Sequence, residues 1–355
     1  MNKFALITVF TFFTFFTVII YTSCDKTEPK GKETRCPCIN RELPTGLNWE
    51  KAENNFVGIE GISFDNYPKV DGSTSARVLN TIIACKLLGV GYRWHATPLT
   101  VPVVGYGEWY LQTNWDDIPE PHKSEFFVKR IMTSQTNGAF MNLIDGKADI
   151  ILTHRTISPD EKAHADALGV TLIETPIALD AFVFIINKEN PVNSLTVSQI
   201  QEIYAQKITN WSQVGGNNAE MKVFTRPRNS GSEEVFRTLV MGELEPADFP
   251  ESSSVGLMFV VFTEVIHNVD GICYTFSNYK DVIARKSCEE VPVLAINNIC
   301  PNENTVKNGT YPFISKVHVA IRSNLDHNSM AYKLYEWLQS ENVKYTIDEC
   351  GFLLK

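Results

Sequence analysis

Three short runs of hydroxyl residues, each at the start of a predicted amphipathic helix, constrain this chain more than any other feature. They are residues 71–75, 133–138 and 229–232, and Arg226 precedes the third run. A helix N-terminus is electropositive and offers free backbone N–H groups, to which serine and threonine hydroxyls add further donors. Any one run alone is more typical of ordinary helix capping. Three of them together with an arginine predict a site that holds a small oxyanion without a metal.

The first 24 residues have the pattern of a secretory signal. Lys3 precedes an apolar run at residues 4–20, and Ser23 then stands before Cys24. A membrane-spanning helix needs about 20 apolar residues, so an uncleaved anchor at this shorter run is the less favoured alternative. The residues before Cys24 resemble a bacterial lipobox, although Tyr21 departs from the usual aliphatic residue. We therefore expect residues 1–24 to be a signal peptide and Cys24 to be lipidated.

The rest of the chain divides into a polar leader and a large folded part. Residues 25–50 are polar, charged and interrupted by prolines, which predicts a flexible tether. The remaining residues, about 310 of them, can bury a core large enough to favour two lobes over one. The net charge is −9 and there is no long basic run, so binding to nucleic acid is not expected.

The eight cysteines do not define one pairing scheme. Setting Cys24 aside leaves an odd number, and connectivity cannot be read from a sequence. Cys36 and Cys38 lack a second close pair of ligands, so a structural zinc site is not expected. Cys85 stands at an apolar helical position, which favours a buried free thiol. Cys288 with Cys300 is the candidate disulfide.

Hydrophobic periodicity indicates strands that alternate with helices, which is typical of the α/β class. Strands are predicted at residues 56–59, 148–153, 176–187, 222–225, 271–276, 291–296 and 311–321. Helices are predicted to follow the first two hydroxyl runs, to begin at Asp160, and to span residues 196–205, 233–241 and 330–340.

Residues 91–125 break this alternation. They combine six tyrosine and tryptophan residues with four prolines, which favours strands and loops over helix. The more ordinary interpretation is an insertion packed on the surface. The alternative is an aromatic loop that overhangs a binding cleft.

The order of these segments resembles the periplasmic phosphate-binding proteins of ABC transporters, within the type 2 solute-binding fold. The similarity is carried by TSQTNGAFMNLIDGKADI at residues 133–150, by the stretch at 176–216 that contains KITNW, and by RPRNSGSEEVF at 226–236. The resemblance implies an α/β fold of two lobes joined by two crossing hinge strands, near residues 176–187 and 311–321. Lobe 1 would comprise residues 51–185 and 312–355, and lobe 2 residues 186–311. Closure of the hinge around the ligand would be the functional motion.

The resemblance also implies which residues contact the anion. Arg226 would supply the charge-assisted bond, and hydroxyl and backbone N–H groups would supply the rest. The implied contacts are Ser73, Thr74, Ser75, Ser134, Thr136, Asn137, Thr153, Arg226, Ser230, Gly231 and Ser232. Arg155 is a further candidate, although an ion pair with Asp149 or Asp160 explains it equally well.

Two departures from the family pattern stand close to this site. Where the best-known members place an aspartate that accepts the proton of phosphate, this chain has His154, whose ordinary interpretation is a surface histidine. Asp71 is the nearest candidate to replace that carboxylate. Glu233 and Glu234 follow the third hydroxyl run directly, and we expect both side chains to point to solvent.

We therefore predict an extracytoplasmic lipoprotein, periplasmic or at the cell surface, that captures phosphate or a similar tetrahedral oxyanion and passes it to an ABC permease. We expect a monomer with no metal and no cofactor. An enzyme is not expected, because the chain has no Gly-x-Ser-x-Gly, P-loop or His-Glu-x-x-His motif. The alternative is a module of the same fold that senses an anion, or binds a protein or another ligand through residues 91–125, without transport.

Overall fold

The computed structural model of the chain describes residues 35–37, 48–96, 109–284 and 290–355. All of them belong to one folded unit, Arg35–Lys355. The predicted signal peptide and Cys24 lie outside the described residues, as do Cys38, Cys288 and residues 97–108. Among the helices that are described, none is both long enough and apolar enough to cross a membrane.

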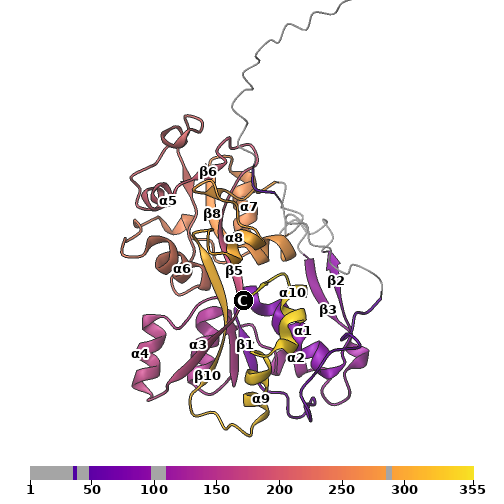
Figure 1. Ribbon diagram of the computed structural model, residues 1–355. Helices are drawn as coiled ribbons and strands as arrows, with labels where there is room; N and C mark the ends of the chain where they lie inside the picture. Colours follow the sequence, from indigo (N-terminus) through magenta and orange to yellow (C-terminus); the bar gives the residue numbers. More distant parts are fainter. Residues whose placement is uncertain (1–34, 38–47, 97–108, 285–289) are drawn as a thin grey trace, which may run out of the picture. The chain divides into compact units, whose positions relative to one another are not determined.

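The framework is one mixed sheet with the strand order β1-β4-β10-β5-β8-β7, and β11 pairs with β5 (Figure 1). β1 runs parallel to β4, and β7 runs parallel to β8, whereas β5 is antiparallel to β8, β10 and β11. The strands of this sheet are β1 Val70–Gly72, β4 Ile150–Thr153, β5 Leu172–Ile186, β7 Lys222–Val223, β8 Gly271–Phe276, β10 Ile314–Arg322 and β11 Leu353–Leu354. Two smaller sheets pair β2 Tyr92–Ala96 with β3 Trp109–Thr113, and β6 Ser194–Leu195 with β9 Ala295–Ile296.

Strand β5 is the link between two groups of elements. Its first part pairs with β10 from Leu172 to Ala181, and its last part pairs with β8 from Phe182 to Ile186. In Figure 1 the helices around β8 therefore lie at one end of β5, and those around β1 and β10 lie at the other. The strands predicted at 176–187 and 311–321 are thus confirmed as β5 and β10 with shifted ends, whereas the predicted lobe boundaries remain predictions.

The helices begin where local signals indicate. Ser158 and Glu161 form a capping box at the start of α4, and Thr196 and Gln199 form one at α5, so each satisfies free N–H groups of a first turn. The α-helices are α1 Arg77–Leu88, α2 Phe126–Lys129, α3 Gln135–Ile144, α4 Pro159–Ala167, α5 Val197–Tyr204, α6 Gly231–Val235, α7 Val260–His267, α8 Glu303–Lys307, α9 Met330–Trp337 and α10 Lys344–Glu349. α6 continues as a π-helical segment, Phe236–Met241, and a second such segment spans Tyr279–Ile283.

An aromatic cluster joins the last part of β5 to the elements around it. The ring of Phe236 stacks on that of Tyr274 with centroids 4.6 Å apart, and it lies 4.5 Å from the ring of Tyr204. Phe184 of β5 meets all three rings edge-on or tilted. These side chains are fully buried, so the hydrophobic effect holds β5 and β8 against α5 and the helical segment that follows Ser232.

Three predicted strands differ from the structure, and one of them, the strand at 222–225, is shortened to Lys222–Val223. Residues 56–59 form no strand, because Phe56 and Ile59 pack against the core as side chains while their backbone makes no ladder. The strand predicted at 291–296 is reduced to Ala295–Ile296. Most apolar residues of segments 56–59 and 291–296 are buried or partly buried without pairing as full strands. A short hydrophobic run in a sequence does not show which of these two arrangements it adopts.

The described part of the 91–125 segment is a hairpin of β2 and β3, followed by the single 3-10 turn Trp115–Asp117 and by loops that carry Pro119 and Pro121. Tyr92 and Trp94 are buried in the core, and the Tyr92 hydroxyl donates to Glu349 at 2.6 Å. The prediction of strands and loops is therefore confirmed, and these two aromatic residues stabilise the fold.

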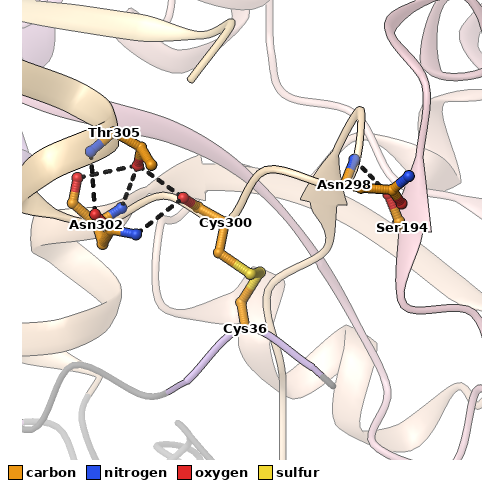
Figure 2. Close-up of a disulfide and its surroundings, with 6 residues drawn as sticks. All are labelled: Cys36, Ser194, Asn298, Cys300, Asn302 and Thr305. Atoms are coloured by element: carbon orange, nitrogen blue, oxygen red, sulfur yellow. Dashed lines mark hydrogen bonds between the residues drawn. A yellow bond between two sulfur atoms is a disulfide. The ribbon is translucent and has the colours of Figure 1, made fainter. Parts of the chain in front are cut away.

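The disulfide joins Cys36 to Cys300, with Cα atoms 5.3 Å apart (Figure 2). The expectation that Cys300 pairs with Cys288 is wrong, because a partner 264 residues away in sequence is brought to it by the fold. Arg35 also donates to the carbonyl of Asn190 at 2.6 Å, so this part of the predicted tether is held on the folded unit. Cys85 is a buried free thiol, as predicted.

Candidate functional site

A cavity of about 460 Å³ lies beyond the carboxyl ends of the parallel strand pairs β1/β4 and β7/β8. Ligands of open α/β sheets bind at this edge because the loops there are free to present donors. Nine of the predicted site residues line it: Ser73, Thr74, Ser75, Thr136, Asn137, Arg226, Ser230, Gly231 and Ser232.

The first wall is the turn after β1. Ser73 caps the 3-10 turn Thr74–Ala76, and its hydroxyl accepts from the N–H of Ala76 at 3.3 Å. The hydroxyls of Ser73 and Ser75 are 3.1 Å apart, and Ser75 Oγ lies 2.7 Å from Nδ1 of His154. Both serines are buried, so their hydroxyl directions are set by these neighbours.

The second wall is the start of α3. Gln135 has a φ of 63°, a left-handed conformation that is uncommon outside glycine and asparagine. Thr136 is buried beside it, and Asn137 donates from Nδ2 to Glu161 Oε1 at 3.0 Å. The bond to Glu161 fixes the Asn137 side chain, so its contribution to the cavity is a rigid one.

The third wall carries the charge. The guanidinium of Arg226 donates from Nε to Ser232 Oγ at 3.2 Å and from Nη2 to the carbonyl of Gly256 at 3.5 Å. Its Nη1 is buried and has no hydrogen-bond partner among the described residues. Burial lowers the pKa of Arg226 from its ordinary value, yet a guanidinium keeps its proton in proteins. Arg226 therefore places a poorly solvated positive charge, with an unused donor, at the cavity.

The second and third walls touch. A Cβ added to Gly231 would lie 2.3 Å from Thr136 Oγ1, so only a glycine permits this approach. Asn229, with a φ of 64°, turns the chain into the Ser230 cap, where Ser230 Oγ accepts from the N–H of Glu233 at 3.3 Å. Asparagine tolerates this conformation better than most residues, which explains its place before the cap.

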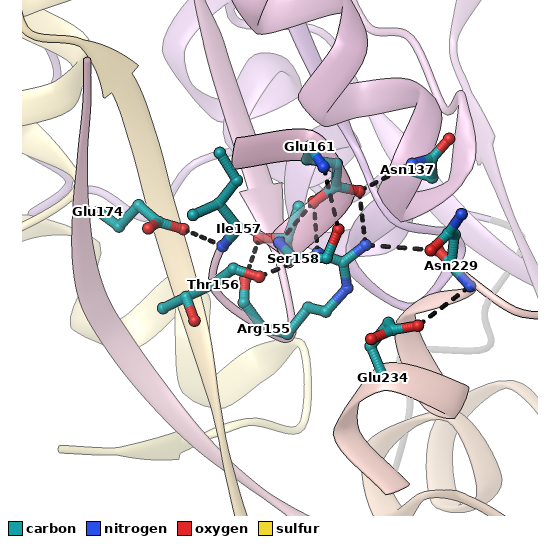
Figure 3. A network of polar contacts seen from close by, with 10 residues as sticks. Asn137, Arg155, Thr156, Ile157, Ser158, Glu161, Glu174, Asn229 and Glu234 are labelled. Carbon is teal, nitrogen blue, oxygen red and sulfur yellow. Dashed lines mark hydrogen bonds and ion pairs between the residues drawn. The ribbon is translucent and has the colours of Figure 1, made fainter. Parts of the chain in front are cut away.

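Arg155 supports the site from outside the cavity (Figure 3). It forms two bonds of 2.7 Å to the carboxylate of Glu161, and its Nη2 lies 3.3 Å from the carbonyl of Asn229. The ion-pair interpretation of Arg155 is therefore the one found, with Glu161 as partner in place of Asp149 or Asp160. Figure 3 shows Glu161 between Arg155 and Asn137, so one buried carboxylate holds Asn137 of the second wall and also Arg155, which in turn reaches Asn229 of the third wall.

Three predicted contacts do not line the cavity: Ser134, Thr153 and Arg155. Ser134 accepts from Asn142 at 3.2 Å, and Thr153 donates to the carbonyl of Arg155 at 2.8 Å. The polar groups of Ser134 and Thr153 therefore form hydrogen bonds within the protein that stabilise the loops around the cavity.

The expectations for the carboxylates near the site are corrected as well. Asp71 accepts from the N–H groups of Gly72 and Ser134 at 2.7 and 2.9 Å, so it joins two loops and does not line the cavity. Glu233 is buried, accepts from Arg237 at 2.7 Å and receives the Tyr274 hydroxyl, so it does not point to solvent. Glu234 is partly exposed and accepts from the N–H of Asn229 at 3.1 Å.

Several residues of the site were not anticipated. Arg77 lines the cavity two positions after the first hydroxyl run, and its positive charge beside that run could have indicated it. Phe276 and Tyr279 also line the cavity, but nothing in the sequence pattern indicates them. His154 is buried and is not a surface histidine. The described residues contain no cluster of three or more side chains able to hold a metal ion. The lining instead offers hydroxyls, amides and one buried guanidinium, which together can bind an oxyanion.

Comparisons with known proteins give related sequences over parts of the chain. Protein SphX of Synechococcus elongatus is 32% identical over 31% of this chain and 34% of its own length. Phosphate-binding protein PstS of Staphylococcus saprophyticus is 25% identical over 62% of this chain and 69% of its own length. The PstS of Borreliella burgdorferi is 24% identical over 51% of this chain and 65% of its own length. The chain thus matches less than two thirds of the length of SphX and of the Borreliella PstS, and the two PstS relatives are named for phosphate binding.

Solved structures share the fold. An ABC-type phosphate transport receptor from Vibrio cholerae has a TM-score of 0.54 at 22% identity, covering 81% of this chain and 99% of that one. A putative phosphate ABC transporter substrate-binding protein with bound phosphate from Clostridium perfringens has a TM-score of 0.53 at 20% identity, covering 83% and 99%. The two-lobed type 2 fold is thereby confirmed.

A family model for the PBP superfamily domain matches residues 123–342, which is more than half of the chain. That stretch contains the second and third walls of the cavity, the linking strand β5 and the whole of β10. This chain therefore belongs to the PBP superfamily.

Proposed function

We propose that the chain is an extracytoplasmic receptor that captures inorganic phosphate, or a similar tetrahedral oxyanion, in the cavity around Arg226. The observation that carries the proposal is the buried Nη1 of Arg226, which has no partner among the described residues. Arg155 and Arg237, in contrast, are paired with Glu161 and Glu233. A buried charge without a partner is costly, so an anion in the cavity would stabilise Arg226 and satisfy its free donor.

The contacts between the walls favour a closed, ligand-holding arrangement. Arg155 reaches the carbonyl of Asn229 at 3.3 Å, and Thr136 leaves no room for a side chain at Gly231. In the predicted division, Arg155 and Thr136 belong to lobe 1, and Asn229 and Gly231 to lobe 2. Capture and release then require these contacts to separate, with bending near the ends of β5 and β10.

Delivery to an ABC permease is the second part of the proposal. It is supported by the names of the relatives and by the signal-like residues 1–24. The Cys36–Cys300 disulfide favours an oxidising compartment outside the cytoplasm. A lipidated Cys24 would keep the receptor close to its permease.

Calorimetric titration of phosphate, sulfate and molybdate into the purified protein tests the capture step. Tight binding of phosphate supports the proposal, and binding of sulfate or molybdate alone keeps an oxyanion receptor with another substrate. Binding of none of the three contradicts it. Coupling to transport is tested in cells that lack the chain: phosphate uptake should be lost and should return with the wild type but not with Arg226→Ala.

A binding role without transport remains a second candidate because of a neighbouring cavity. This cavity of about 240 Å³ is lined by Leu111 and Thr113 of β3. It shares Thr74, Arg77 and Tyr279 with the larger cavity around Arg226. It could accept an organic group attached to the anion. Leu111→Trp, which fills it, should leave phosphate affinity unchanged and abolish binding of a larger phosphate monoester. Equal affinity of wild type and Leu111→Trp for the monoester would exclude this candidate.

A further inference from the structure

A chain of buried polar groups leads from the cavity into the protein. Ser73 Oγ and Ser75 Oγ are 3.1 Å apart, Ser75 Oγ is 2.7 Å from His154 Nδ1, and His154 Nε2 is 3.3 Å from Asp180 Oδ2. Ser73 and Ser75 line the cavity, and His154 and Asp180 are 2% and 4% exposed. Water therefore has little access to His154 and Asp180. The positions of the protons are set by the hydrogen-bonding needs of the four side chains.

Asp180 determines which nitrogen of His154 carries a proton. Its Oδ1 accepts from the N–H groups of Ala181 at 2.8 Å and Asn278 at 3.1 Å, which leaves Oδ2 directed at the imidazole. The two atoms face each other as an ion-pair contact of 3.3 Å, and neither His154 Nε2 nor Asp180 Oδ2 has a hydrogen-bond partner among the described residues, so each is the group available to the other. A carboxylate only accepts, so a neutral His154 carries its proton on Nε2 and presents the lone pair of Nδ1 to Ser75.

The directions of both serine hydroxyls follow. Ser75 donates to His154 Nδ1, so the Ser73 hydroxyl is the donor of the bond between the two serines. Ser73 Oγ already accepts from the N–H of Ala76. The protons in the series from Ser73 through Ser75 and His154 to Asp180 therefore all point away from the cavity. Hydrogen bonds aligned in the same direction reinforce one another. Ser75 lines the cavity, and its oxygen keeps one lone pair that no described group uses.

We propose that Asp180 and His154 hold Ser75 as a hydrogen-bond acceptor, so that the cavity selects an oxyanion that still carries a proton. This inference rests on the proposed function, since it concerns which oxyanion the same cavity takes. The proton of monohydrogen phosphate can be donated to Ser75 Oγ. A fully deprotonated anion such as sulfate has no proton to donate to Ser75 Oγ. Its oxygen and the serine oxygen would then both be acceptors, and the repulsion between them disfavours binding of that anion. His154 and Asp180 are positioning residues that act through Ser75.

Asp180→Asn is the sharpest test because the fold fixes the orientation of the new amide. The N–H groups of Ala181 and Asn278 retain the carbonyl oxygen, so the amide NH2 faces His154 Nε2 and donates to it. His154 must then carry its proton on Nδ1 and donate to Ser75, whose own proton becomes free to point into the cavity. The Ser75 hydroxyl therefore reverses its direction, although the size of the residue at 180 barely changes.

The measurement is the ratio of phosphate to sulfate affinity at pH 8, by calorimetry on the whole protein. We expect a strong preference for phosphate in the wild type and a ratio reduced about tenfold or more in Asp180→Asn, mainly through tighter sulfate binding. Asp281→Asn, which removes a neighbouring buried carboxylate that bonds Ser277 and not His154, is the control and should retain the wild-type ratio. An unchanged ratio in Asp180→Asn, or equal binding of sulfate and phosphate by the wild type, would overturn the inference.

The nitrogen NMR shifts of the His154 imidazole test the same inference without a ligand or a variant. A neutral ring protonated on Nε2 at pH 8 is expected, and a proton on Nδ1, alone or in a doubly protonated ring, would overturn it. Wild type that binds neither anion yet shows the Nε2 proton would count against the proposed function and leave the proton arrangement standing. The two failures are therefore distinguishable.

Discussion

Gly231 and Thr136 meet across the cavity so closely that a Cβ on Gly231 would stand 2.3 Å from Thr136 Oγ1. The two residues come from the starts of α6 and α3, which lie 95 positions apart in the sequence. Their contact sets how far the walls of the cavity can approach each other.

Gly231→Ala should therefore impair closure. Overpacking of this kind costs about 1–3 kcal/mol, so phosphate affinity should fall about tenfold. The clash is relieved when the walls separate, and the thermal midpoint without ligand should change little. Calorimetry and a thermal melt measure the two quantities. Gly58→Ala, where a Cβ meets only ordinary contacts of 3.6 and 3.7 Å, is the control, and full affinity in Gly231→Ala would refute the closed arrangement.

Arg226→Met should separate binding from folding. Charge-assisted hydrogen bonds contribute about 1.5–3 kcal/mol each, so loss of two of them should weaken phosphate binding about 100-fold or more. Replacing an unpaired buried charge by an apolar side chain is often neutral or stabilising, so the ligand-free protein should unfold at the same denaturant concentration or a higher one. Arg228→Met, at an exposed position of the same cavity, should weaken binding far less. Comparable losses in the two variants would mean that the charge acts at long range and not through Nη1.

Glu161→Gln should destabilise the protein strongly. The Glu161 carboxylate accepts from Arg155 twice, from the N–H of Ser158 at 2.8 Å and from Asn137 at 3.0 Å. Removing one partner of a buried ion pair leaves the other charge unpaired and costs about 3–5 kcal/mol. Urea unfolding measures the loss. Asp160→Asn, one residue earlier and exposed, should cost under about 1 kcal/mol, and equal losses in both variants would contradict the structural role of the pair.

His318 should make stability depend on acid. Burial lowers the pKa of His318 from its ordinary value of 6.5 to about 4. Between these two pH values the unfolded chain binds a proton at this position and the folded chain does not, so the free energy of unfolding increases with pH across that window. The stability that His318 contributes is therefore lost as the pH is lowered from about 6.5 towards 4.

Urea unfolding of His318→Gln at several pH values checks this dependence. The slope between pH 4 and 6.5 should be smaller than in the wild type, by less than full burial would give because the ring is partly exposed. His327→Gln, which removes an exposed histidine, is the matched control. A wild-type slope in His318→Gln would assign the acid sensitivity to other groups.

Features that depend on near neighbours in the chain could be predicted from the sequence. The strand at Gly271–Phe276 has the predicted bounds, and α1 buries the predicted apolar face that includes Val78 and Ile82. The helix start at Thr196 follows from a capping partner three residues away, Gln199. The three hydroxyl runs and Arg226 likewise identified most of the cavity lining, because a run of donors at a helix start is a local pattern.

Partners far apart in the sequence were decided by the tertiary structure alone. Cys300 pairs with Cys36 across 264 positions. Asp180 lies on β5 and His154 directly follows β4, and both strands pair with β10, so the sheet brings the two side chains to 3.3 Å from each other. Among the described residues, Arg155 has an ion-pair partner and Arg226 has none, although each arginine has carboxylates five to seven positions away in the sequence. A local pattern fixes which groups a segment offers, whereas the free energy of burying a charge or a polar group depends on what the rest of the chain brings to it.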